Sequence, residues 1–349
     1  MRKPLFLFLA VSSVLPAADK VRISETAGLA REQEPVIAAI AGKQRVLFVT
    51  IGANQSKVVD TGSLQPKERL RRKQTDPVGF QIENSAYWAD LSKRMVAGKE
   101  EDSGTLRGLL FKRFGVLLER TQNRMHWAPS FQRTGARGYT SIAMWTPVQK
   151  VERTEAPGAF TFTREGFHAS YPEIALWAEY RFFAHVPYFL FRSTMTITSP
   201  IEIFWLRNQE MTMDDLFTHV AWPGPGARPV LTGFEGRKKL LENQTLPADV
   251  PWVAFLNLDK GYGFGAVALA YHASKTAHAI TSINDGAANG KYWDRRIIDQ
   301  TPVMLAPGDR FEEHTAFVLF QAPPSAPLAE FLTWEKKLRH PVRVEPLKD

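Results

Sequence analysis

Polar side chains that could move protons or neutralise an acid recur between residues 207 and 296, in a part of the chain rich in tryptophan, phenylalanine and isoleucine. The set comprises Arg207, Asn208, Glu210, Asp215, His219, Tyr292, Arg295 and Arg296, and Trp205, Trp222 and Trp293 accompany it. Charged groups are costly to bury without partners, so we expect these side chains to line an open, concave face. For any single member, a network of arginines and carboxylates that only fixes loops is the structural alternative.

A second cluster lies at residues 123–129, where an asparagine and an arginine precede His126, Trp127 and Pro129. Proteins bind sugars with such mixtures, because the C–H faces of a sugar stack on aromatic rings while its hydroxyls form directional hydrogen bonds. His126 and Trp127 are therefore candidate substrate-binding residues. In the alternative interpretation, Trp127 belongs to the core and His126 is an ordinary surface residue.

Several common catalytic signatures are absent. The glycine-rich segment 286–291 has too few residues between its glycines, and no serine or threonine after its lysine, to form a P-loop. There is no G-x-S-x-G elbow and no H-E-x-x-H helix, and His272 and His278 are too far apart for a helical ligand pair. The chain has no cysteine, which excludes disulfides, thiolate metal sites and cysteine nucleophiles. We predict neither a metal site nor a cofactor.

The elements that must position the candidate residues are strands. In residues 188–197, the side chains of Phe189, Phe191, Met195 and Ile197 fall on one face of an extended chain, and the intervening residues fall on the other. Aromatic and β-branched residues suit a half-buried pleated surface. Strands of this length need a large sheet to join.

Residues 179–222 are punctuated at His185-Val186-Pro187 and at Ser199-Pro200, which predicts at least three successive antiparallel strands. Further strands are expected at residues 45–51, 139–145, 158–163, 252–258, 262–271 and 311–320. We expect a loop at residues 284–296 and a short C-terminal helix capped at Ser325. The predicted fold class is all-β, a large antiparallel β-sandwich with a few short helices.

The length of the chain and its N-terminal segment indicate the number of domains and the cellular location. A chain of 349 residues suits one large all-β domain. Residues 1–18 begin with Arg2 and Lys3, continue as an apolar run and end in small residues, as a secretory signal peptide does. We expect a periplasmic or secreted bacterial protein in which residues 19–349 form a single domain. No later segment is apolar for long enough to cross a bilayer, so no membrane partner is expected after removal of the signal peptide.

The formal net charge is +8, and two of these charges leave with the signal peptide. A basic balance favours anionic partners. The basic segment 67–73 has no interleaved aromatic residues and no recognised binding motif, so we expect no nucleic-acid partner. The segment forms either a solvated basic face or one side of a groove for an acidic glycan.

Two stretches resemble the galactose-mutarotase-like super-sandwich, a β-sandwich shared by aldose epimerases and by domains of polysaccharide lyases and some glycosidases. Residues 179–197 are similar to its central strands. Residues 82–88 and 103–115 are similar to its opening hairpin, where an "E-N" strand is followed by a Gly-led strand ending in "K-x-x-G". The resemblance covers roughly residues 80 to 320. It implies this sandwich fold and a carbohydrate partner, for which an anionic polysaccharide is one candidate.

Among the reactions that fit such a site, we favour β-elimination by a polysaccharide lyase acting on a uronic-acid-containing glycan. Arg207 or Arg296 would neutralise the substrate carboxylate, so that the C5 proton becomes acidic. His219 and Tyr292 would remove that proton and protonate the leaving oxygen.

Two alternatives remain open. In an aldose-epimerase-like enzyme, Glu210 or Asp215 would shuttle protons together with His219. In a non-catalytic glycan-binding sandwich, tryptophans would serve as stacking platforms. The candidate catalytic residues are thus His219, Tyr292, Arg207, Arg296 and Glu210, and the candidate substrate-binding residues are Asn208, Asp215, Trp222, Trp293, Arg295, His126 and Trp127.

Overall fold

The computed structural model describes residues 20–92, 94–96, 99–101, 104–119, 127–141, 150–213, 216–234, 246–286 and 290–347. Strands dominate this part of the chain, their pairings are antiparallel, and α1 (Ala329–Arg339) is its single α-helix. The predicted all-β sandwich is confirmed. Within the described ranges, no helix is both long and apolar enough to span a bilayer.

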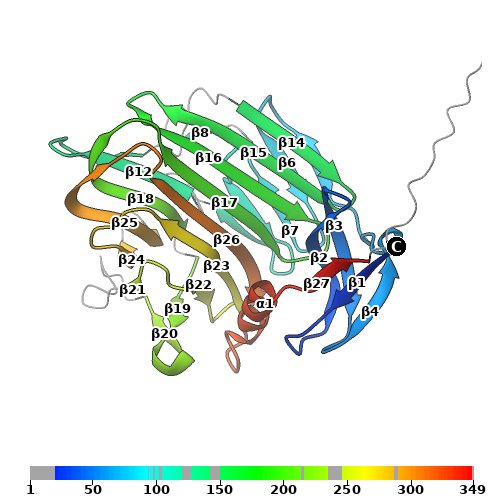
Figure 1. The fold of residues 1–349 in the computed structure, drawn as a ribbon. Helices are drawn as coiled ribbons and strands as arrows, with labels where there is room; N and C mark the ends of the chain where they lie inside the picture. The colour runs from blue at the N-terminus through cyan, green and yellow to red at the C-terminus, as the bar shows by residue number, and fades with distance from the viewer. Residues whose placement is uncertain are drawn as a thin grey trace, which may run out of the picture.

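Two layers form the sandwich (Figure 1). The large sheet has nine strands, in the order β14 (Lys150–Ala156), β15 (Ala159–His168), β16 (Tyr171–Phe183), β17 (Tyr188–Ile197), β26 (Arg310–Gln321), β23 (Tyr262–Ala273), β22 (Trp252–Asn257), β19 (His219–Pro223) and β20 (Pro229–Gly233). The facing sheet has six, in the order β13 (Thr140–Ser141), β12 (Trp127–Arg133), β18 (Ile201–Met213), β25 (Gly290–Leu305), β24 (Ile280–Gly286) and β21 (Leu246–Pro247).

Smaller sheets complete the fold. Five strands, in the order β11 (Val116–Glu119), β10 (Gly108–Phe111), β7 (Tyr87–Asp90), β6 (Phe80–Glu83) and β5 (Arg71–Gln74), contribute to the same core as the two main sheets. A three-stranded sheet joins β27 (Arg343–Pro346), β1 (Lys20–Ser24) and β4 (Ser56–Asp60). Two hairpins are β2 (Arg31–Ile40) with β3 (Lys43–Ile51), and β8 (Arg94–Val96) with β9 (Lys99–Glu101). Short 3-10 turns are η1 (Thr61–Ser63) and η2 (Pro225–Ala227).

The alternation predicted for β17 sets the core. Phe189, Phe191, Met195 and Ile197 are all buried in the main hydrophobic cluster between the layers. The opposite face of the large sheet is divided. Near Tyr188 it is covered by α1, and farther along it is partly open.

Two local predictions were wrong. Of residues 284–296, expected as a loop, 284–286 lie in β24 and 290–296 lie in β25, where Tyr292, Asp294 and Arg296 alternate with the inward-facing Trp293 and Arg295. The C-terminal helix begins after Leu328, and no side chain caps it, so Ser325 is not its cap. Packing defines this helix instead, since Phe331 contacts the rings of Trp252 and Phe320 at 5.3 and 5.0 Å.

Candidate functional site

The outer face of the facing sheet gathers several of the predicted residues. In β18 and β25, the side chains that turn away from the core share this face with residues of β24 and with Tyr139, which precedes β13. We call it the polar-aromatic face, and it comprises Tyr139, Trp205, Arg207, Ser282, Tyr292, Asp294, Arg296 and Asp299. Paired strands place directly opposite residues on the same side of a sheet, so this set follows from the register.

Asp294 is the centre of the polar-aromatic face. Only 1% of the residue is exposed, although it lies on the outward side of β25. Arg207 Nη1 lies 3.4 Å from Asp294 Oδ2, and Arg296 Nε lies 3.3 Å from each carboxylate oxygen. The Ser282 hydroxyl donates a further hydrogen bond to Oδ1. These donors compensate the burial of the carboxylate and fix its orientation.

Arg296 joins Asp294 to a second carboxylate, since its Nη1 lies 3.3 Å from Asp299 Oδ2. Burial by itself lowers the pKa of the Arg296 guanidinium, but the charges of Asp294 and Asp299 outweigh that effect and raise the pKa above its ordinary value. Arg296 is therefore a permanent cation with two fixed acidic neighbours.

Aromatic rings lie directly beside this charged cluster. The rings of Tyr139 and Trp205 stack at 6.2 Å with 22° between their planes. The Arg296 guanidinium lies 4.8 Å from the centre of the Trp205 ring, and that of Arg207 lies 5.9 Å from the Tyr139 ring. Tyr139 is 59% exposed. The arrangement offers an accessible ring next to charged hydrogen-bonding groups.

Besides Tyr292, two further predicted residues, Glu210 and Trp127, belong to the strands of this face. Tyr292 pairs with Thr212 of β18 and with Asn284 of β24. It lies two residues before Asp294 in β25, so both side chains are on the same side of the sheet. The backbone of Glu210 pairs with that of Asp294, and the backbone of Trp127 pairs with Gln209. The side chains of Glu210 and Trp127 lie outside the described part of the structure.

Other predicted residues point the opposite way, so the expectation of one common face was wrong for them. Arg295 and Trp293 are 2% and 1% exposed, and the Arg295 guanidinium binds Glu313 of the large sheet at 2.5 Å inside the sandwich. Asn208 is also fully buried and hydrogen-bonds with Ser193. The physical reason is the two-residue period of a strand, which sends neighbours in sequence to opposite sides.

His219 and Trp222 lie on β19 of the large sheet, not on the polar-aromatic face. Val220 and Trp222 belong to the core, so alternation turns His219 to the outer side of that sheet with Ala221. Its Nδ1 lies 2.8 Å from the Thr218 hydroxyl. The structure therefore separates His219 from Arg207, Arg296 and Tyr292. His126 and Asp215 lie outside the described residues.

Sequence reasoning missed Asp294, Ser282, Asp299 and Tyr139 as members of this face. The sequence did carry a signal for Asp294. Tyr292, Asp294 and Arg296 are alternate residues, so in a strand their side chains share one side. In the described ranges, no group of three or more His, Asp or Glu side chains could hold a metal ion. The expected absence of a metal and a cofactor stays a prediction.

Comparisons with known proteins support the fold. No protein-family model matches the chain, and no curated protein sequence matches it. Among solved structures, an α-mannosidase from Enterococcus faecalis V583 matches over 95% of this chain and 46% of its own, with a TM-score of 0.57 and 8% identity. A putative aldose 1-epimerase from Klebsiella pneumoniae matches over 77% of this chain and 86% of its own (TM-score 0.48, 11% identity). A galactose mutarotase-like protein from Lactobacillus casei matches over 69% of this chain and 100% of its own (TM-score 0.41, 10% identity).

The β-sandwich fold expected from the sequence is confirmed, and the matched structures include galactose-mutarotase-like and aldose 1-epimerase proteins. The structural neighbours are carbohydrate-active proteins of the glycoside hydrolase and aldose epimerase kinds. The chain spans 40% of the length of the GH36 α-galactosidases from Geobacillus stearothermophilus that it also matches.

Proposed function

We propose that this galactose-mutarotase-like sandwich binds a carbohydrate chain on its polar-aromatic face. The observation that carries the proposal is the stack of Tyr139 and Trp205 directly beside the cluster of Arg207, Asp294 and Arg296. An exposed ring accepts the C–H face of a sugar, and neighbouring guanidinium and hydroxyl groups take its hydroxyls.

We propose β-elimination from a uronic-acid-containing glycan as the reaction. Arg207 and Arg296 supply positive charge on this face, and each guanidinium has five N–H donors, so a substrate carboxylate can be bound beside Asp294. Tyr292 takes the role first assigned to His219. Its phenolate would remove the C5 proton, the C4–O4 bond would break as a C4–C5 double bond forms, and the phenol would return the proton to the leaving O4.

The aldose-epimerase alternative loses one of its two expected pairs. The backbone of Glu210 belongs to the facing sheet, whereas His219 belongs to the large sheet, so the two residues come from different layers. Asp215 lies outside the described residues. The non-catalytic alternative needs only the aromatic platform and its hydrogen-bonding neighbours, so it becomes an outcome of the test.

The purified protein should be incubated with a panel of uronate polysaccharides while ultraviolet absorbance from unsaturated products is followed. We expect turnover by the wild type, none by Tyr292→Phe, and weakened binding by Trp205→Ala. Turnover that survives in Tyr292→Phe would remove the assigned proton carrier. Binding without any product would leave a glycan-binding protein and reject the lyase, and no binding to any carbohydrate would reject the whole proposal.

We also propose that the protein is exported to the periplasm or the medium. The support is the basic, apolar and small-residue order of residues 1–18, together with the absence of cysteine. Cell fractionation of the native protein tests this, with N-terminal sequencing to find the cleavage point. A protein recovered uncleaved from the cytoplasm would contradict it.

A further inference from the structure

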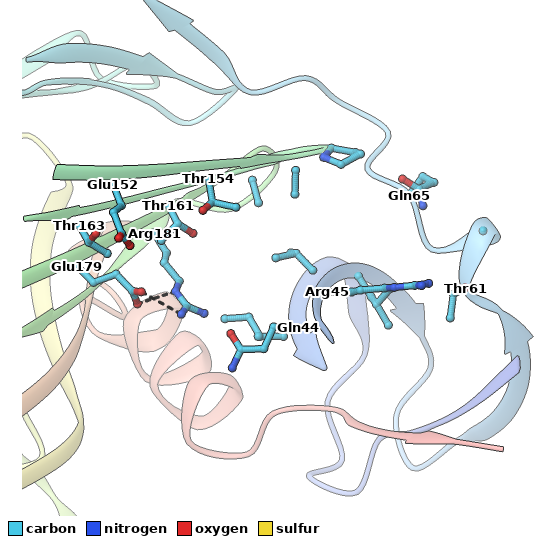
Figure 2. Close-up of a pocket in the computed structure, with 17 residues that line it drawn as sticks. Gln44, Arg45, Thr61, Gln65, Glu152, Thr154, Thr161, Thr163, Glu179 and Arg181 are labelled. Carbon is cyan, nitrogen blue, oxygen red and sulfur yellow. Dashed lines mark hydrogen bonds and ion pairs between the residues drawn. The ribbon is translucent and has the colours of Figure 1, made fainter. Parts of the chain in front are cut away.

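A groove with a cavity volume of about 1000 Å³ lies on the outer side of the large sheet, away from the polar-aromatic face. Its floor is β14, β15 and β16, and its wall is the hairpin of β2 and β3 with residues of the following segment (Figure 2). No residue of the polar-aromatic face lines it. Its volume is at the upper end of the range for small-molecule sites, so it can hold a ligand of several linked units.

The floor of the groove is a regular plate of polar side chains. One cross-strand row consists of Thr154, Thr161 and Arg181, and the next consists of Glu152, Thr163 and Glu179. The intervening residues of the same strands, including Phe160, Phe162 and Phe182, fill the core on the other side. Strand alternation therefore fixes the direction of all six polar side chains.

The wall of the groove also presents polar groups. Gln44 and Arg45 of β3 lie across the gap from Arg181, and Gln65 lies at the far end (Figure 2). Ile37 and Val46 add an aliphatic patch to the same wall. A ligand in the groove would meet hydrogen-bonding groups on two sides.

The charges in the groove are balanced. The Arg181 guanidinium binds the Glu179 carboxylate at 2.6 and 3.1 Å, in a two-point contact along β16. The charged residues that line the groove are Arg45, Arg181, Glu152 and Glu179, which makes two positive and two negative groups. A charged polymer would gain no net attraction from these four groups.

We propose that this groove is a second carbohydrate-binding site and that it takes a neutral oligosaccharide. A sugar hydroxyl both donates and accepts, so it can pair with threonine hydroxyls, with glutamine amides, with the Glu179 carboxylate and with the Arg181 guanidinium. The aliphatic patch of Ile37 and Val46 suits the C–H faces of the sugar rings. A purely apolar ligand would leave the threonine hydroxyls without partners. This inference does not depend on activity at the polar-aromatic face.

The test uses the full chain and defined neutral gluco-, manno-, galacto- and xylo-oligosaccharides of several residues, with binding measured by calorimetry. The double variant Thr161→Val and Thr163→Val removes two hydroxyls and keeps the β-branched shape. We expect its affinity to fall by about tenfold or more, because each lost hydrogen bond weakens binding by a factor of several. The matched control is Thr196→Val on β17, which lies on the same outer side but outside the groove.

Trp205→Ala separates the two sites. The groove is supported if a neutral oligosaccharide still binds this variant with wild-type affinity and binds the double threonine variant weakly. It is overturned if binding is lost in Trp205→Ala and unchanged in the threonine variant, or if no member of the neutral panel binds the wild type. A failure of uronate turnover alone would overturn only the lyase reaction.

Discussion

Arg295 and Arg296 are neighbours in sequence, and they belong to two different networks. Arg295 points into the sandwich, where its side chain is 3% exposed and binds Glu313, which is fully buried. Arg296 points outward, where its side chain is 18% exposed and binds Asp294 and Asp299. Both networks pair guanidinium with carboxylate, but only the outer one can be reached by a ligand.

Residue composition does not distinguish the buried network from the partly exposed one. The inner pair is surrounded by Tyr271 and Trp293, whose rings lie 5.4 and 5.7 Å from the Arg295 guanidinium. The outer pair also has an aromatic neighbour, Trp205, at 4.8 Å from Arg296. What differs is the side of the strand, and with it the access of water and substrate.

The largest expected effect is on stability, and it separates the two networks. Glu313→Ala leaves the Arg295 charge buried without its partner, so the free energy of unfolding should fall by about 3–5 kcal/mol. Asp294→Ala should lower it by only about 1–2 kcal/mol, since Arg296 keeps Asp299 and both outer guanidiniums keep contact with water. Denaturant unfolding measures both. Equal losses would show that the inner network is no more structural than the outer.

The next effect is on ligand binding and compares two tryptophans. Trp205→Ala should weaken the binding of a uronate glycan to the polar-aromatic face by about tenfold, corresponding to the loss of a stacking contact of about 1.4 kcal/mol, while folding is kept. Trp293→Phe, inside the core, should leave binding unchanged and lower the melting temperature. Calorimetric titration of both variants measures the affinity, and thermal unfolding measures the melting temperature. A Trp293 variant that loses binding but not stability would contradict the comparison.

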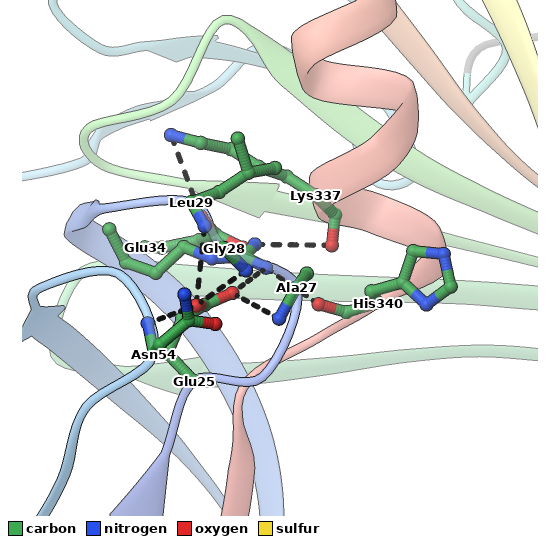
Figure 3. Close-up of polar contacts among 9 residues, drawn as sticks. Glu25, Ala27, Gly28, Leu29, Glu34, Asn54, Lys337 and His340 are labelled. Carbon is green, nitrogen blue, oxygen red and sulfur yellow. Dashed lines mark hydrogen bonds and ion pairs between the residues drawn. The ribbon is translucent and has the colours of Figure 1, made fainter.

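A third network extends the comparison to the junction of the N-terminal strands with the end of α1 (Figure 3). There Arg31 binds Glu25 and Glu34 and donates to the carbonyl oxygens of Lys337 and His340. Burial by itself raises the pKa of Glu25, but hydrogen bonds from the Asn54 N–H, from the N–H groups of the adjacent turn and from Arg31 outweigh it and lower the pKa to about 2.

Because the pKa of Glu25 is lowered in the folded protein, this network should stabilise the fold less at acid pH. As the pH falls, Glu25 takes up a proton in the unfolded chain before it does so in the folded protein. The contribution of ionised Glu25 to the free energy of unfolding is therefore complete above pH 4.5 and is lost progressively as the pH falls from 4.5 towards 2. Urea unfolding across this range should show the loss in the wild type and a smaller one in Glu25→Gln. Parallel pH profiles for the two proteins would rule out this role.

A second pH effect concerns His314, on the outer side of the large sheet. Burial, together with the charges of Arg192 and Arg181, lowers the pKa of His314 from 6.5 to about 4. Because the unfolded chain accepts the proton first, stability should decline between pH 6.5 and pH 4 and then change no further from this group. Replacing His314 with Gln should flatten that part of the profile. NMR titration of the imidazole gives the pKa directly, and an ordinary value near 6.5 would be the contrary result.

Much of the fold could be predicted from local patterns. The alternation of Phe189, Phe191, Met195 and Ile197 was enough to identify a strand of a large sheet, since a period of two is a property of the chain itself. The same reasoning failed for residues 284–296. Their glycines and polar side chains suggested a loop, although residues 284–286 and 290–296 belong to β24 and β25. The cap at Ser325 was wrong because packing of Phe331 on the sheet, and not local capping, sets the helix.

By itself, the sequence determined that this protein is a β-sandwich, and it singled out Arg207, Tyr292 and Arg296 as candidates. Only the tertiary structure decided that these three share a side with Asp294, that Arg295 and His219 do not, and that β3 forms a groove with β14 to β16. Period and propensity act between near neighbours along the chain. Strand order and register join residues that are far apart in sequence, and these depend on the packing of whole layers.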